Sequence, residues 1–127
     1  MLLDDVDKTQ RLMAALEAAV PIEAILAPQL RRDLSAKDPA LPSSGRCTVD
    51  RVAYLGDLGG IMCHLGFGFD KPGPPHVISI THLIFRANTP HYREIDAYQR
   101  HRVKKLKKYQ GGLYEGTEVF DLRPREL

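Results

Sequence analysis

Residues 46–69, RCTVDRVAYLGDLGGIMCHLGFGF, predict a β-hairpin, and this hairpin decides the fold. From Ile61 to Phe69, apolar residues alternate with polar, small or flexible ones, which is the period-two pattern of a strand with one apolar face. The run 46–56 before the turn is rich in Thr, Val and Tyr and predicts the partner strand. Residues 57–60, Asp-Leu-Gly-Gly, supply the glycines that a tight turn requires.

Helical patterns precede the hairpin. In residues 4–36, apolar side chains recur at a spacing near that of a helical turn, which predicts two N-terminal helices. Pro21 ends or kinks the first helix. The second is expected over residues 22–34, and Pro28 inside it predicts a break at which Pro28 opens a new turn.

The segments after the hairpin predict one more strand and a helix. Residues 77–85 are apolar on both alternating faces, which is typical of a strand in the interior of a sheet with both faces covered. In a chain this small, we expect the second cover to be another subunit. A capping Asn-Thr before Pro90 and a Gly-Gly stop signal predict a helix over residues 90–109. Residues 113–122 are expected to form a short last strand.

The predicted fold is therefore α+β, with a single domain over residues 1–127. N-terminal helices (4–36) precede a three- to four-stranded, mostly antiparallel sheet (46–86) with its hairpin at 57–60, and a C-terminal helix packs on that sheet. The expected core draws on all of these elements and comprises Leu16, Ile61, Cys63, Leu65, Phe67, Ile78, Ile80, Ile84, Ile95, Tyr98 and Leu106.

The composition limits the class of protein. The chain has 127 residues, 43% hydrophobic and 27% charged, which is ordinary for one folded domain. Its net charge of +2 is too small to bind nucleic acid or a membrane over the whole surface, so such a partner would need a local patch. Acidic residues near the N-terminus argue against a signal peptide, and charges and proline interrupt the most apolar region. We therefore expect a cytoplasmic protein with reduced thiols and no membrane partner.

The two cysteines are not expected to form a disulfide. A turn centred on Leu58-Gly59 places Cys47 opposite residue 69 or 70. Cys47 would then lie about 20 Å from Cys63, which is far beyond bridging distance.

Histidines near the hairpin form the first candidate site. Cys63 and His64 are neighbours on one strand and point to opposite faces, so they cannot bind one metal ion. His82 is expected on the core face with Cys63, but two ligands do not make a zinc site. No metal and no cofactor are therefore predicted. The plain interpretation is a buried thiol and a histidine that is hydrogen-bonded within the sheet.

Two glycines form the second candidate. Gly66 and Gly68 alternate on one face of the second strand, and their missing side chains let another group approach the sheet closely. A packed helix is the favoured interpretation, ahead of a second subunit or a ligand. The candidate contacts for a ligand or partner are His64, Gly66, Gly68 and His82.

Basic residues near the end of the C-terminal helix form the third candidate. Six cations fall within nine residues with no acid among them, namely Arg100, Arg102, Lys104, Lys105, Lys107 and Lys108. A basic helical face with this density could bind phosphates. The plain interpretation is that bases near the end of a helix and acids near its start complement the helix dipole without any partner.

Three functional hypotheses remain. The first is a non-enzymatic module that works as a homo-oligomer, most simply a dimer, or with a protein partner; its basis is the doubly apolar strand over residues 77–85. The second is a nucleic-acid-associated protein that uses Arg100–Lys108. The third is a small enzyme with His64 or His82 in a cleft between sheet and helix. No paired carboxylates and no Ser-His-Asp arrangement can be read from the spacing, so no catalytic residue is assigned.

Overall fold

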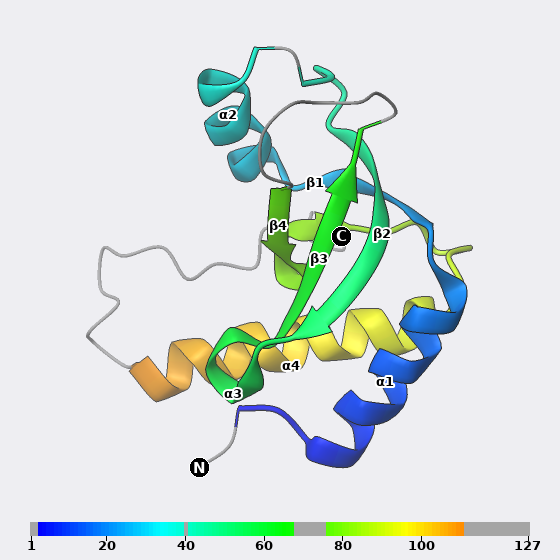
Figure 1. The fold of residues 1–127 in the computed structure, drawn as a ribbon. Helices are drawn as coiled ribbons and strands as arrows, with labels where there is room; N and C mark the ends of the chain where they lie inside the picture. The colour runs from blue at the N-terminus through cyan, green and yellow to red at the C-terminus, as the bar shows by residue number, and fades with distance from the viewer. Residues whose placement is uncertain (1–2, 40, 68–75, 111–127) are drawn as a thin grey trace.

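The computed structural model describes residues 3–39, 41–67 and 76–110 (Figure 1). Its elements, in chain order, are α1 (Val6–Ala19), β1 (Ile22–Leu26), α2 (Pro28–Lys37), β2 (Arg46–Tyr54), α3 (Gly56–Gly59), β3 (Ile61–Gly66), β4 (His76–Ser79), the 3-10 helix η1 (Ile80–His82), β5 (Leu83–Ile84) and α4 (Tyr92–Gln110). The predicted α+β class is confirmed, because an N-terminal helix and a C-terminal helix accompany a curled antiparallel sheet. The strand expected over residues 113–122 lies outside the described residues.

The predicted hairpin is formed by β2 and β3. The turn between them is the single helical turn α3, which closes when the backbone N–H of Leu55 donates to the carbonyl of Gly60 at 2.9 Å. Gly60 has a φ of 70°, a left-handed conformation that favours glycine. Tyr54 pairs with Ile61, one or two residues short of the expected register, because the turn is centred one residue earlier than predicted.

This register also places the two cysteines. Cys63 pairs with Val52 in β2, whereas Cys47 pairs with Ala24 in β1. Both side chains are buried free thiols. The two cysteines thus lie on different strands of the sheet and opposite different partners.

The helix expected over residues 22–26 is wrong, because these residues form β1 inside the sheet, between β2 and β5. Ile22, Ala24 and Leu26 are buried, and the residues between them face outward, which is the period of a strand. An apolar pattern of only five residues fits either a helix or a strand, so the pairing with neighbouring strands decides. Pro28 begins α2, as predicted.

The interior strand expected over residues 77–85 is also wrong. This segment is divided into β4, η1 and β5, and the strand order β4-β3-β2-β1-β5 places β4 and β5 at opposite edges of the sheet. The Ser79 hydroxyl caps η1, which carries the chain from one edge to the other. Ile80 is buried by this turn, whereas Val77 on β4 is 38% exposed. The apolar pattern therefore reflects a turn into the core and does not require a covering subunit.

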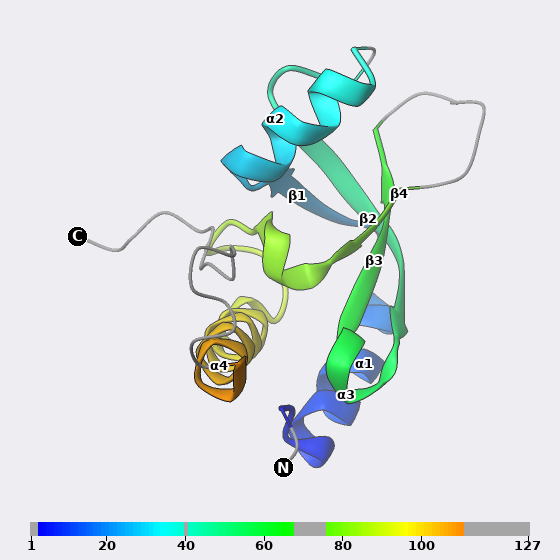
Figure 2. The same ribbon diagram turned by 90° about the vertical axis from the view of Figure 1, so that its left-hand side faces the viewer.

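The core lies between the sheet and the two long helices, α1 and α4. In Figure 2, α4 is seen end-on beside the strands. Most of the predicted core residues are buried, namely Leu16, Ile61, Cys63, Leu65, Ile80, Ile95 and Tyr98. Phe67, Ile78, Ile84 and Leu106 are half-buried. Among the described residues, no helix combines the length and apolar character needed to cross a bilayer.

Candidate functional site

The outer face of β3 carries the first of the predicted site residues. His64 is half-buried there, between Arg51 of β2 and Val77 of β4. This face looks toward the viewer in Figure 1, and no described helix crosses it. The two cross-strand neighbours of His64 are both exposed. The outer face is therefore open among the described residues.

Gly66 leaves room for a neighbouring side chain and not for a helix. A Cβ atom at this position would collide with the carboxylate of Asp50 and would lie 3.1 Å from the hydroxyl of Thr48. The Thr48 hydroxyl donates a hydrogen bond to that carboxylate at 2.7 Å. The expectation of a packed helix is wrong here, because side chains of the partner strand fill the space. Gly68 lies outside the described residues.

His82 lies in η1, away from the outer face of β3. Its Nδ1 is buried and has no hydrogen-bond partner within the described part of the chain. Burial lowers the pKa of this imidazole, because the charged form loses its hydration. The described residues contain no cluster of three His, Cys, Asp or Glu side chains that could hold a metal ion.

The outward side of α4 carries the basic residues, but not all six that the sequence indicates. Five exposed cations lie on one arc of about 100° around the helix axis and extend over about 22 Å of its length. We call this set the basic face, and it comprises Arg93, Arg100, Lys104, Lys107 and Lys108. Lys105 is half-buried beside it. Arg93 was not among the predicted residues, although its helical spacing from Arg100 would have placed it there.

Arg102 lies on the opposite side of α4, about 180° around the axis from Arg93. It is only 2% exposed. Its guanidinium donates to the carboxylate of Asp4 at 2.9 Å, and it also donates to the backbone carbonyls of Asp57 and Leu58. The assignment of Arg102 as a phosphate contact is therefore corrected, because its donors are already used inside the protein.

Asp4 is the centre of a hydrogen-bonded arrangement, which we call the Asp4 network: Asp4, Tyr54, Asp57, Tyr98 and Arg102. Asp4, Tyr98 and Arg102 are buried, Asp57 is half-buried, and Tyr54 is 39% exposed. The second carboxylate oxygen of Asp4 accepts hydrogen bonds from the hydroxyls of Tyr54 at 2.8 Å and Tyr98 at 2.9 Å. Burial and the neighbouring Asp4 raise the pKa of Tyr54 to about 12, and they also raise the pKa of Tyr98. Both phenols therefore stay protonated and act as donors.

Asp57, in the hairpin turn, connects this network to the start of the chain. Its carboxylate accepts hydrogen bonds from the backbone N–H groups of Leu3 and Asp4 at 2.7–2.8 Å. Burial acts to raise the pKa of Asp57, but these donors and the charge of Arg102 outweigh it, so the pKa is lowered. Every member of the Asp4 network has a partner inside the protein, so its role is structural.

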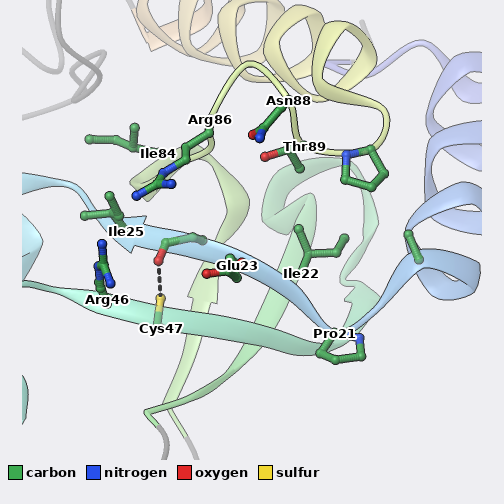
Figure 3. Close-up of a pocket in the computed structure, with 13 residues that line it drawn as sticks. Pro21, Ile22, Glu23, Ile25, Arg46, Cys47, Ile84, Arg86, Asn88 and Thr89 are labelled. Atoms are coloured by element: carbon green, nitrogen blue, oxygen red, sulfur yellow. Dashed lines mark hydrogen bonds between the residues drawn. The ribbon is translucent and has the colours of Figure 1, made fainter.

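A pocket opens where β5 stops pairing with β1 (Figure 3). β5 pairs with only the last two residues of β1, and residues 86–90 then turn away toward α4. The cavity has a volume of about 270 Å³. Its charged lining residues are Glu23, Arg46 and Arg86. Neither His64 nor His82 lines it, so it is not the histidine-containing cleft of the enzyme hypothesis.

Cys47 contributes to the pocket wall. Its thiol donates to the backbone carbonyl of Ala24 at 3.6 Å (Figure 3). Burial, together with the charge of Asp50, raises the pKa of Cys47 to about 11, so the thiol is protonated at neutral pH and is a poor nucleophile. The chemistry available in this pocket is thus binding by charged and polar groups.

Comparisons of the chain with protein-family models, with curated proteins and with solved structures find no match. Any function proposed for the chain therefore rests on its own residues.

Proposed function

We propose that the protein is a non-enzymatic binding module that holds a nucleic-acid backbone on the basic face of α4. The observation that carries this proposal is the alignment of exposed cations along one side of the helix, with no acid inside the arc. Glu94 and Asp96 lie on either flank of the arc and not within it. The basic face is about 22 Å long, which matches the length of about six phosphates along one strand of duplex DNA at a spacing of 3.4 Å.

Nearly all of the positive charge of the basic face is available to a partner. Arg100 is partly neutralised by Asp96, whose carboxylate lies 3.0 Å from its guanidinium. The other four cations have no ion pair among the residues that the structure describes. Bringing four phosphates to them would release counterions, so binding should weaken steeply with salt.

Fluorescence anisotropy with labelled duplex DNA and single-stranded RNA tests this proposal. For four to five phosphate contacts on a duplex, we expect log K to fall with log salt concentration with a slope of about −4. The double variant Lys104→Ala/Lys107→Ala should reduce the steepness by about 2. The matched control Lys8→Ala/Lys37→Ala removes the same charge from exposed positions on α1 and α2 and should leave the slope unchanged.

Either of two results contradicts the proposal. One is an affinity that does not depend on salt. The other is an equal loss of affinity in the α4 variant and the control, which would mean that only net charge acts and that the basic face has no specific role.

The edge strand β4 supports a second candidate, a homodimer formed by sheet extension. β4 pairs only with β3 in the described sheet, which leaves its other edge without a strand partner. Val77, on this strand, is 38% exposed. Antiparallel pairing of two β4 edges would cover it and complete the backbone ladder.

Light scattering after size exclusion tests the dimer. The wild type should elute as a dimer, and Val77→Lys should convert it to a monomer, because a charged edge opposes strand addition. Leu58→Lys is the matched control, since Leu58 is 72% exposed and lies in the turn α3, which is not part of β4. A wild-type protein that is monomeric at high concentration would exclude this candidate.

A further inference from the structure

The pocket between β1 and residues 86–90 lies beside an interrupted hydrogen-bond ladder. The backbone N–H of Ala27 donates to the carbonyl of His82 at 3.0 Å, and Ile25 pairs with Ile84. Alternate residues of β1 therefore direct their backbone groups toward β5. Glu23 is the next residue in this series, but β5 ends at Ile84. Its N–H and C=O consequently face the pocket side, with no strand partner among the described residues.

The side chains around this gap carry complementary charges. In Figure 3, Arg46 and Arg86 lie on either side of Ile25 at one end of the pocket, and Glu23 lies between that end and Ile22. Neither guanidinium forms an ion pair within the described part of the chain. A guanidinium is the preferred partner of a carboxylate, and a carboxylate such as that of Glu23 suits an ammonium group.

The size and the apolar end of the pocket limit the ligand further. A cavity of about 270 Å³ has room for about nine water molecules at liquid density, and hence for a ligand with a similar number of non-hydrogen atoms. Pro21 and Ile22 line the end opposite the two arginines (Figure 3). From one end to the other, the pocket therefore offers an anion site at the two arginines, the backbone edge and carboxylate of Glu23, and an apolar surface.

We propose that this pocket binds a small α-amino acid with an apolar side chain. Its carboxylate lies against Arg46 and Arg86, and its ammonium group lies against Glu23. Its polar atoms take the place of the residue that would continue β5 opposite Glu23. This ligand site is independent of the basic face of α4, which lines no part of the pocket.

An NMR titration of the ¹⁵N-labelled protein with leucine tests the site. Leucine matches the cavity in size, and its binding should shift the amide signal of Glu23. Two analogues divide the contributions: leucinamide lacks the carboxylate, and 4-methylpentanoate lacks the ammonium group. We expect leucine to bind about tenfold or more tightly than either analogue, because each one loses a charge-assisted contact.

Two variants assign the contacts to residues. Arg86→Gln should weaken leucine binding about tenfold and leave leucinamide binding unchanged. Arg32→Gln is the matched control, because Arg32 is exposed on α2 and does not line the pocket. The proposal is overturned by an absence of binding at about 10 mM leucine, where a site of millimolar affinity is largely occupied. It is also overturned by equal affinity for leucine and 4-methylpentanoate, or by an Arg86→Gln variant that behaves as wild type.

Discussion

Replacing Arg102 by methionine is expected to destabilise the protein strongly, and the magnitude follows from the Asp4 network. The side chains of the Arg102–Asp4 ion pair are 3% and 1% exposed. The substitution leaves the Asp4 carboxylate buried without its cation and removes the donors to the carbonyls of Asp57 and Leu58. Removing one partner of a buried pair costs about 3–5 kcal/mol. That is a large part of the roughly 5–15 kcal/mol by which a domain is stable.

Urea unfolding followed by circular dichroism measures this loss. The matched control is Lys104→Met, which exchanges the same kinds of side chain on the exposed side of the same helix and should change the free energy of unfolding by less than about 0.5 kcal/mol. Asp4→Asn should cost much less in the Arg102→Met protein than in the wild type, because no buried pair is left to break. We expect a coupling energy of about 2 kcal/mol.

A loss of less than about 1 kcal/mol in Arg102→Met would refute this reasoning, since a surface cation contributes no more than that. Equal losses in Arg102→Met and Lys104→Met would refute it as well. Either result would mean that the Asp4 network does not stabilise the fold.

Three further predictions concern the acid limb of stability, the thiols and the hairpin. Because the pKa of Asp57 is lowered in the folded protein, its carboxylate stabilises the fold at a pH above the ordinary pKa of an aspartate. This stabilisation is lost as the pH falls through the pKa of the folded protein. In urea unfolding, Asp57→Asn should therefore be less stable than wild type at about pH 7, and the difference in the free energy of unfolding should be smaller at about pH 3. Burial raises the pKa of Cys47 to about 11 and that of Cys63 to about 12, so a thiol reagent should label both slowly in the native protein and rapidly in about 6 M guanidinium. Gly66→Ala should reduce the free energy of unfolding by about 1–3 kcal/mol, and Asp50→Ala in the same chain should recover part of it, because the added methyl group collides with that carboxylate.

Each of these three predictions has its own contradicting result. A constant difference between Asp57→Asn and wild type over this pH range would mean that the carboxylate is not specifically stabilised. Fast labelling of both thiols in the native protein would contradict their burial. An unchanged stability of Gly66→Ala would show that Asp50 moves aside without cost.

The predictable part of the fold is the part in which a periodic pattern is long. The alternating residues 61–69 predict a strand, which the structure shows over Ile61–Gly66. The 19-residue helix α4 has a buried side that the sequence marks clearly. The apolar pattern of the five residues of β1 fits the period of a helix as well as that of a strand. Their pairing with β2 and β5 depends on segments far away in the sequence. The turn inside residues 77–85 cannot be predicted for a related reason: buried residues on both sides of a chain result equally from an interior strand and from a turn into the core.

Some features of the candidate sites can be predicted from the sequence, and others cannot. The separation of Arg102 from the basic face was available from the sequence, because the 3.6-residue period of a helix places Arg102 among the apolar residues of α4. Its partner Asp4 was not, since nothing local marks a contact between residues 98 apart in the chain. The pocket was not predictable either, because it depends on the point at which β5 leaves β1.

The long span of the Asp4 network has a consequence for how the chain acquires its structure during synthesis. Asp4 leaves the ribosome before its partners, because Arg102 and Tyr98 follow it by 98 and 94 residues in the chain. Until α4 emerges, the Asp4 carboxylate has no buried cation, and the turn carbonyls have no donors. We expect the hairpin and the helix α1 to dock only loosely before that point, so that stable folding waits for α4 to be made.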